Sequence, residues 1–332
     1  MINNIILVGG FPKPIGGVTS FVRRLAVSDI RIEEVVDVYF DKEKEIPADY
    51  LGKYKKLKNK WFGFMYLFFK MRVWRNKHLH FNFSTFKSLL FFVLLPKYNT
   101  KWILMLHHGV LESPLPAFLV RHLLRRFDHI ICLNETQYQT YCIHGICSGK
   151  LVKASSYIRP LVSRPNKKFQ KDIDIFLSSK PTFIASGSPN ALYNFEWCIR
   201  FFSSRKDYQL VVFIYGEGPE KIKLKELIRK YDNIRAYWDQ REDNFNYALA
   251  NAFYYIRPNA RDSFGIAVAD AVNFGVPVLA SDVCPRFQGA STFKITTYES
   301  FENTLDCALN KGSTENNFQT TSFVPFSYDL II

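Results

Sequence analysis

The sequence contains no apolar run long enough to cross a membrane. Its longest apolar runs are WFGFMYLFF, which begins at Trp61, and LLFFVLLP, which begins at Leu89. Both are well short of the roughly 20 residues that a transmembrane helix needs. The first residues, MINNIILVGGFP, also lack the basic region and the small-residue cleavage site of a signal peptide. We therefore expect neither a membrane span nor a secretion signal.

The cysteines are too scattered to form a disulfide framework or a zinc site. There are six in the chain, and no two of them make a CxxC pair. His78 and His80 alternate along an apolar run without a carboxylate or cysteine pattern nearby, so we interpret them as packing or surface residues. We expect reduced thiols in a cytoplasmic protein, no metal site and no cofactor.

Acidic residues are scarce relative to basic ones. The 44 Lys and Arg against 30 Asp and Glu give a net charge of +14, which indicates anionic partners. No zinc-finger, RNP or homeodomain-like pattern is present, so we do not expect nucleic acid. From residue 53 to 77, Lys and Arg alternate with Trp, Phe, Tyr and Met. This mixture fits a segment lying on anionic lipid headgroups, and it equally fits a core helix with a basic solvent face.

Short apolar runs alternate with helix-like stretches along the 332 residues. This alternation predicts α/β domains, each with a parallel sheet covered on both faces. The predicted strands are 5–8, 35–40, 78–81, 102–106, 129–133 and 151–154 in the first half, and 182–185, 210–215, 233–237, 253–256 and 276–280 in the second.

A segment rich in Pro, Ser and charge, from 159 to 181, has too little periodicity for a core element and predicts a linker. We therefore expect two Rossmann-like domains, 1–164 and 165–317, that face each other across a cleft. We further expect residues 318–332 to pack back on the first domain. In such sheets, ligands bind beyond the carboxyl ends of the strands.

The stretch from Arg257 to Asp282, RPNARDSFGIAVADAVNFGVPVLASD, has the features of a binding site. It places Asp262 and Asp270 around a strand, a loop and a helix predicted to begin near Ser263. The free amide groups at a helix N-terminus attract a phosphate, and Gly265 would keep its approach clear. The alternative is that Asp262 caps the helix and Asp270 merely packs or is solvated.

The spacing D-x7-D with an internal FG, followed by GVPVLASD, resembles the E-x7-E element of the group 1 family of retaining GT-B glycosyltransferases. Three other segments follow the family's order. Gly16 and Gly17 come after the first strand, Gly187 follows TFIAS, and YGEGPE follows QLVVFI. The resemblance covers most of the chain and implies a GT-B fold with two Rossmann-like domains.

The resemblance implies transfer of a sugar from a nucleotide-sugar to an acceptor with retention of anomeric configuration. It implies that Asp262 contacts hydroxyl groups of the donor sugar, that Asp270 contacts the ribose, and that His108, in the pair before Gly109, lies near the acceptor. A structural role for the two adjacent histidines remains the alternative. The predicted catalytic residues are His108 and Asp262, and the predicted donor-binding residues are Gly16, Gly17, Gly187, Gly216, Glu217, Arg257, Ser263, Phe264, Gly265, Asp270 and Arg286.

Together with the basic, aromatic first domain, the resemblance implies a peripheral enzyme on the inner face of a bacterial membrane. The implied acceptor is a lipid-linked saccharide of a surface polysaccharide, such as lipopolysaccharide O-antigen, capsule or exopolysaccharide. The reaction needs stabilisation of the departing diphosphate more than it needs a strong base.

The sequence departs from the family pattern where two cations are expected. Ser188 and Asn194 stand where the family usually has an Arg and a Lys that bind the diphosphate. Arg257, Arg261 and Arg286 are the candidate substitutes, with Arg286 preferred. A non-catalytic partner in a polysaccharide assembly complex therefore stays an alternative. An NAD-dependent dehydrogenase fits less well, because GGFPKPIGG is not a G-x-G-x-x-G fingerprint.

Overall fold

The computed structural model describes residues 5–12, 16–39, 44, 46–47, 49–108, 111, 115–160, 164–262, 264–311 and 324–331. The chain forms two compact units. Unit 1 comprises Met1–Ile158 and Ser322–Ile332, and unit 2 comprises Arg159–Thr321. The sequence-based boundary after residue 164 lies a few residues beyond this division. Each unit is described by itself below.

Unit 1 is built on a sheet of seven parallel strands in the order β3-β2-β1-β4-β5-β6-β7. The strands are β1 Ile5–Gly9, β2 Ile32–Asp37, β3 Lys53–Lys56, β4 His78–Phe83, β5 Lys101–Leu106, β6 His129–Cys132 and β7 Leu151–Lys153. The helices are α1 Gly17–Ser28, α2 Lys60–Val73, α3 Ala117–Leu124 and α4 Glu135–Ile143, with 3-10 turns η1 Phe86–Phe92, η2 Ser148–Lys150 and η4 Tyr328–Leu330.

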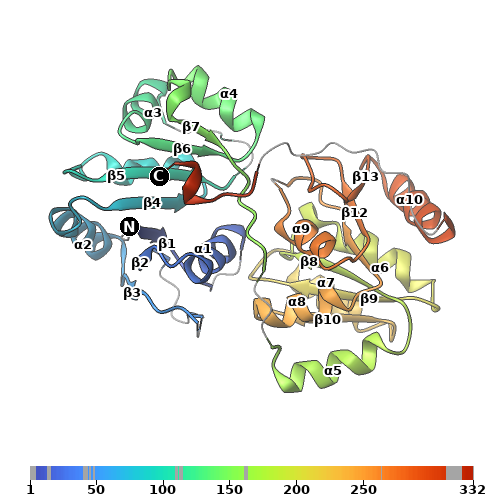
Figure 1. Cartoon of the computed structure of the whole chain (residues 1–332). Coiled ribbons are helices and arrows are strands. Elements are labelled where there is room, and N and C mark those ends of the chain that lie inside the picture. The colour runs from blue at the N-terminus through green and yellow to red at the C-terminus, as the bar shows by residue number, and fades with distance from the viewer. Residues whose placement is uncertain are drawn as a thin grey trace. The chain divides into compact units, whose positions relative to one another are not determined.

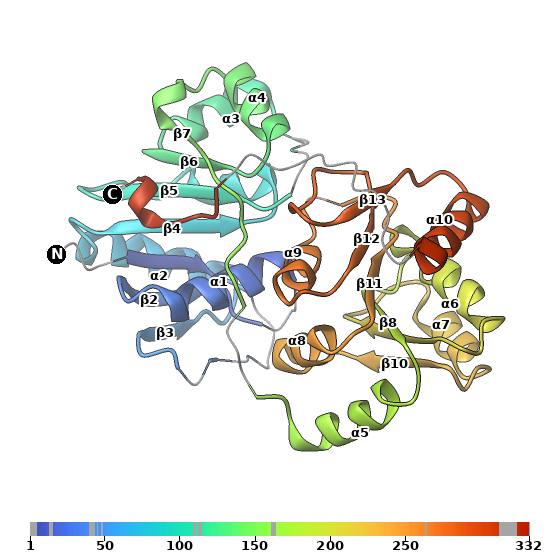
Figure 2. The same ribbon diagram turned by 45° about the vertical axis from the view of Figure 1, so that its right-hand side comes forward.

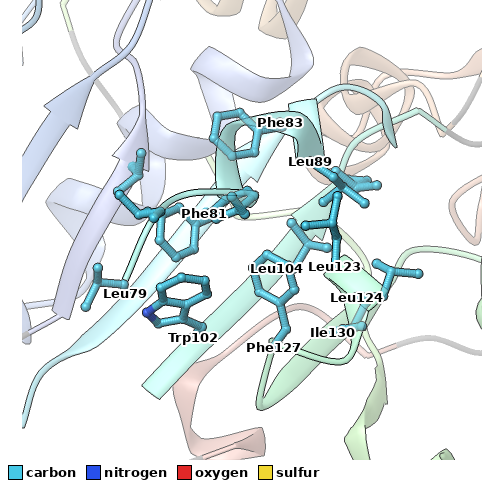
Figure 3. Close-up of a cluster of buried hydrophobic side chains, with 14 of the residues drawn as sticks. Leu79, Phe81, Phe83, Leu89, Trp102, Leu104, Leu123, Leu124, Phe127 and Ile130 are labelled. Carbon is cyan, nitrogen blue, oxygen red and sulfur yellow. The ribbon is translucent and has the colours of Figure 1, made fainter. Parts of the chain in front are cut away.

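The side chains of the central strands alternate between the two faces of this sheet, and each face is covered by helices. Figure 3 shows the larger core, where β4, β5 and β6 meet η1 and α3. Phe81 and Trp102 contact each other edge to face at 5.5 Å between ring centroids, and Phe127 packs against both. On the opposite face, α1 contributes Phe21 and Leu25.

The end of the chain packs on the second face of unit 1. The described residues 324–331, drawn in red, lie beside β4 and β5 (Figures 1 and 2). Pro325 forms a parallel bridge with Ser155, and the Tyr328 hydroxyl lies 2.8 Å from Nδ1 of His80. Phe326 is buried against Phe21. This segment therefore completes the core of unit 1.

Unit 2 repeats the same plan with a sheet of six parallel strands in the order β10-β9-β8-β11-β12-β13. Its strands are β8 Thr182–Gly187, β9 Gln209–Ile214, β10 Ile234–Trp238, β11 Tyr254–Arg257, β12 Val278–Ser281 and β13 Ser291–Phe293. Its helices are α5 Lys167–Leu177, α6 Phe195–Ser203, α7 Lys221–Ile228, α8 Glu242–Ala250, α9 Ile266–Asn273 and α10 Tyr298–Lys311, with the 3-10 turn η3 Ala191–Tyr193. The predicted fold class, two doubly wound parallel sheets, is confirmed.

Three details of the prediction are wrong. The segment 159–181 contains α5, whose Phe169, Ile173 and Phe176 fall at helical spacing and are buried against the sheet. Two strands, β3 and β13, were not predicted, and each lies at one edge of its sheet. The helix expected near residue 263 begins at Ile266, because Gly265 takes a left-handed conformation, with φ of 77°, and ends the preceding loop.

Each sheet has one topological switch point, where the strand order reverses direction. It lies between β1 and β4 in unit 1 and between β8 and β11 in unit 2. The connections from these two strands leave toward opposite directions, which opens a crevice outside their carboxyl ends. In unit 2, the position that this topology favours for a ligand therefore lies at the carboxyl ends of β8 and β11.

Candidate functional site

The candidate site of unit 2 begins with Arg257, the last residue of β11. This strand pairs in parallel with β8, which ends at Gly187. Nη1 of Arg257 points to the carbonyl oxygen of Ser186 at 3.5 Å, and its guanidinium carbon lies 6.0 Å from the centre of the Tyr193 ring. The guanidinium therefore lies across the ends of β8 and β11, at the topological switch point.

Asp262 holds two guanidinium groups together. Its Oδ2 accepts from Nε of Arg257 at 2.5 Å and from Nη1 of Arg286 at 2.7 Å, and its Oδ1 accepts from Nη2 of Arg257 at 3.1 Å. The side chains of Arg257, Asp262 and Arg286 are 12%, 8% and 1% exposed. We call these three residues the Arg-Asp-Arg cluster. Its two cations and one anion leave a net charge of +1 in a buried position.

The charges in the cluster fix its protonation state. Burial alone would raise the pKa of Asp262, but the charge of Arg257, and the hydrogen bonds from both guanidinium groups, hold this pKa well below its usual range. The carboxylate therefore stays ionised at neutral pH. It serves as a fixed anion rather than as a source of protons.

Arg286 and Arg257 differ in how their hydrogen-bond donors are used. Nε of Arg286 donates to the carbonyl oxygen of Ser281 at 2.8 Å, and its Nη2 reaches the Ser281 hydroxyl at 3.1 Å. Arg286 is thus enclosed and anchors Asp262. Among the residues that the structure describes, Nη1 of Arg257 makes only long contacts, 3.4 Å to the Tyr255 hydroxyl and 3.5 Å to the carbonyl oxygen of Ser186. Arg257, not the preferred Arg286, is the cation with unused capacity.

Two glycines border the cluster because no larger residue fits. A Cβ on Gly187 would lie 1.9 Å from the Tyr193 ring, which covers the end of β8. A Cβ on Gly265 would lie 2.8 Å from Nη1 of Arg286, and this glycine has a positive φ. Both predicted glycines therefore lie at the site for steric reasons.

The remaining predicted residues of unit 2 are placed around this point. Asp270 lies in the middle of α9 and is 1% exposed. Because Asp262 precedes the helix, the two carboxylates do not share one helical spacing. Phe264 is 7% exposed, and Ser263 lies outside the described residues. Arg261, the third candidate cation, is exposed.

The loop after β9 contains Gly216 and Glu217, which were predicted to bind the donor. The amide of Gly216 donates to Oδ1 of Asp239 at 2.7 Å, which ties this loop to the end of β10. Glu217 has an 86% exposed side chain and pairs with Lys221 at 2.5 Å. The two residues thus lie at the same edge of the sheet as Arg257.

The positions without the family's cations have structural roles. Asn194 adopts a left-handed conformation, with φ of 49°, and donates from its side-chain amide to the carbonyl oxygen of Pro258 at 2.7 Å. It thereby connects the loop after β8 to the loop after β11. Ser188 lies in the turn that follows Gly187.

In unit 1, the predicted residues Gly16, Gly17 and His108 also follow parallel strands. Gly16 caps α1, which begins at Gly17, and a Cβ at Gly16 would meet nothing within 4 Å. His108 follows β5 and is exposed. His107 is buried, its Nε2 lies 3.1 Å from Oδ1 of Asn82, and burial lowers its pKa to about 3. The pair therefore divides into one packed and one exposed histidine, and Gly109 lies outside the described residues.

Sequence reasoning missed Asp37, which ends β2 and is fully buried. Its carboxylate accepts from the amide of Phe11 at 3.1 Å and from the Tyr54 hydroxyl at 3.0 Å, and Nζ of Lys44 lies 3.2 Å away. Asp37 thus fixes the loop after β1. Its only signal was an acidic residue within a predicted strand, because that strand was predicted to continue to residue 40 whereas β2 ends at Asp37.

Several predictions concern what the chain lacks. All six cysteines are free thiols. Within the part of the chain that the structure describes, no group of three His, Cys, Asp or Glu side chains is arranged to hold a metal ion. Across the same residues, no helix has the length and apolar character needed to cross a membrane.

Comparison with known proteins shows what the chain is similar to. Residues 166–289 match the family model described as glycosyl transferases group 1. HepE from Anabaena, solved with UDP-glucose, superimposes with a TM-score of 0.69 at 12% identity, covering 93% of this chain and 90% of that one. Sucrose-phosphate synthase from Thermosynechococcus elongatus gives 0.64 at 14% identity with the same coverage. The fold is therefore the GT-B fold of glycosyltransferases.

One curated relative also matches in sequence. The gpi3 subunit of phosphatidylinositol N-acetylglucosaminyltransferase from Schizosaccharomyces pombe is 20% identical over 185 residues. The match covers 50% of this chain, and the chain spans only 36% of that relative. The chain is therefore similar to group 1 glycosyl transferases over residues 166–289, and it shares the GT-B fold over most of its length.

Proposed function

We propose that the protein transfers a hexose from a nucleotide-sugar to a lipid-linked saccharide, with retention, during synthesis of a bacterial surface polysaccharide. The observation that carries the proposal is the Arg-Asp-Arg cluster at the switch point of a segment that matches group 1 glycosyltransferases. A nucleotide-sugar carries a diphosphate, and a guanidinium group binds phosphate oxygens with paired hydrogen bonds. Arg257 is the residue we assign to that group.

In the proposed reaction, the bond from the anomeric carbon to the diphosphate breaks and a bond to the acceptor oxygen forms. The acceptor hydroxyl passes its proton to an oxygen of the departing diphosphate, and the nucleoside diphosphate leaves with the electron pair of the broken bond. Negative charge therefore develops on the diphosphate, where a fixed cation lowers the barrier most. Arg257 supplies this cation, Gly187 and Gly265 keep the backbone close, and the nucleotide-sugar is a co-substrate rather than a bound cofactor.

The donor class is supported by HepE, whose structure holds UDP-glucose. For the acceptor, the gpi3 relative belongs to an enzyme named for phosphatidylinositol, a lipid. A lipid-linked acceptor fits a peripheral position on the inner face of the cell membrane, and the basic first unit supports that position. His108 is assigned to the acceptor side and Asp270 to the nucleotide of the donor.

The test is a panel of UDP-, GDP-, ADP- and CMP-sugars, assayed for hydrolysis and for transfer to a membrane extract of lipid-linked acceptors. We expect turnover with one donor, and at least about a tenfold loss of affinity for it in Asp270→Asn and Arg257→Gln. Arg229→Gln is the matched control, because it removes an exposed arginine of unit 2 that follows the last residue of α7. Retention is checked by NMR of the product's anomeric configuration.

A second candidate is a non-catalytic GT-B partner in a polysaccharide assembly complex. The specific observation behind it is that Asn194 is committed to a structural hydrogen bond and cannot supply a cation. Binding of a nucleotide-sugar by calorimetry without turnover, in the presence of acceptor, would favour this candidate. Turnover lost in Arg257→Gln would remove it.

A further inference from the structure

The outward face of α2 is apolar although it is exposed. Among residues 61–73, the exposed side chains are Trp61, Phe62, Met65, Phe68, Phe69, Arg72 and Val73. At about 100° per residue, these seven side chains fall within one arc of roughly 140° around the helix axis. Six of the seven are apolar, and Trp61 is 81% exposed. An exposed helix face in a soluble domain is normally polar.

The inward face of the same helix serves the core. Leu67, Met71 and Trp74 are buried in the large cluster of unit 1. The sequence left two interpretations of this segment, a core helix with a basic outer face or a helix on lipid. The structure has a feature of each interpretation. The inner side of the helix packs on the sheet, and the outer side is apolar. The core of unit 1 is the apolar partner of the inner face. The exposed apolar face of the same helix needs a second apolar partner.

The apolar surface continues from α2 onto η1. Phe64 of α2 contacts Phe91 of η1 at 5.8 Å between ring centroids, and it also contacts Phe68 at 6.0 Å. Just beyond η1, Val93 and Leu94 are 47% and 72% exposed. Contiguous exposed apolar area of this kind marks an interaction site rather than ordinary surface.

The charge around this surface selects its partner. From residue 50 to 111, the chain contains 12 Lys and Arg and not one Asp or Glu. Exposed basic residues lie just before and just after the helix, at Lys58 and Arg75, and Arg72 lies within the apolar arc. Long basic side chains at the edge of an apolar face reach phosphate groups while the face itself enters the lipid. A second copy of the chain would instead bring two positive surfaces together.

We propose that the exposed face of α2, extended by Val93 and Leu94, docks unit 1 on an anionic phospholipid bilayer. This inference deepens the proposed function by naming the surface that brings the enzyme to a lipid-linked acceptor. Trp61, Phe62 and Phe69 enter the headgroup region, and the flanking basic residues bind lipid phosphates. The helix lies along the membrane plane, because its opposite face is held by the core of unit 1.

The experiment uses the full chain and vesicles of phosphatidylcholine with or without phosphatidylglycerol. We expect binding to the anionic vesicles that weakens with salt, and at least a tenfold loss in the variant Trp61→Ser/Phe62→Ser/Phe69→Ser, whose three positions are exposed and do not serve the core. The variant Ile175→Ser/Ile222→Ser is the matched control, because it removes two apolar side chains that are 64% and 74% exposed in unit 2. Lys58→Gln and Arg72→Gln should each cost about fivefold on anionic vesicles.

Trp61 also reports insertion directly. Trp74 and Trp102 are buried and Trp197 and Trp238 are half-buried, so a blue shift of tryptophan emission on adding vesicles should disappear in Trp61→Phe. Failure to bind anionic vesicles, or equal losses in the unit 2 control, would overturn the inference. The inference would also be overturned if the unmodified protein were a dimer and the triple variant were a monomer that still bound vesicles equally well. Vesicle binding needs no donor, so its outcome is independent of whether sugar transfer is found.

Discussion

The two units share one topology but differ in where their charge lies. Unit 1 carries 23 Lys and Arg against 12 Asp and Glu, whereas unit 2 carries 21 against 18. Unit 1 exposes its excess positive charge beside an apolar helix face. Unit 2 buries two arginines around one aspartate at the ends of its strands. A shared doubly wound scaffold thus supports a surface in one unit and an enclosed site in the other, so function has to be argued from the site rather than from the fold.

The difference predicts that unit 2 depends on one carboxylate. Asp262→Ala leaves Arg257 and Arg286 buried without their anion, which should destabilise unit 2 by about 3–5 kcal/mol. Hydrogen exchange of the strands in each unit measures this effect, and unit 1 should be unchanged. Asp282→Ala is the control, because Asp282 is exposed in the loop after β12. Equal protection of unit 2 in both variants would show that the cluster does not stabilise it.

Unit 1 has its own buried titratable groups, and these predict a different response to acid. Burial lowers the pKa of His80 and of His107 to about 3 each. Below pH 6.5, the unfolded chain binds protons that the folded chain does not, so stability falls as the pH drops from 6.5 toward 3. The loss at pH 5 is about 2 kcal/mol for each histidine.

Hydrogen exchange at pH 7 and pH 5 should therefore show unit 1 losing protection while unit 2 keeps it. Asp37 acts in the opposite direction, because burial raises its pKa. His107→Gln isolates the histidine contribution, since it removes the titrating ring and should reduce the acid sensitivity of unit 1. Unchanged sensitivity in this variant would assign the effect to other groups.

The sequence predicted those elements whose signal is local. Central strands are continuous apolar runs, so most were placed to within a few residues. The outer strand KYKK has no apolar run, because an edge strand is half solvated. The apolar residues of α5 are separated by Lys, Gln and Asp, and this composition was mistaken for a linker.

The residues of the Arg-Asp-Arg cluster were named from the sequence, but their contacts were not. Arg257 and Asp262 were both named, yet their pairing depends on the loop between them folding back on β11. Arg286 was preferred as the substitute for the missing cations because its loop follows a strand, and the structure shows that packing against Ser281 encloses it. Side-chain burial of this kind is set by segments distant in sequence, so no local pattern reveals it.

A pair of glycines gives the smallest contrast between the units. Gly187 and Gly16 both follow the first strand of their sheet, and both were predicted to bind the donor. A Cβ on Gly187 would lie 1.9 Å from the Tyr193 ring, whereas one on Gly16 would meet nothing within 4 Å, and its φ of −175° suits any residue. Gly187→Ala should therefore cost about 1–2 kcal/mol of stability and weaken donor binding, because Tyr193 must move away from the end of β8. Gly16→Ala should change stability by less than about 0.5 kcal/mol.

Urea unfolding of the two variants measures the difference in stability. The double variant Gly187→Ala/Tyr193→Ala should lose less stability than the sum of the losses in its two single variants. Additive losses would mean that the ring over Gly187 is not the cause.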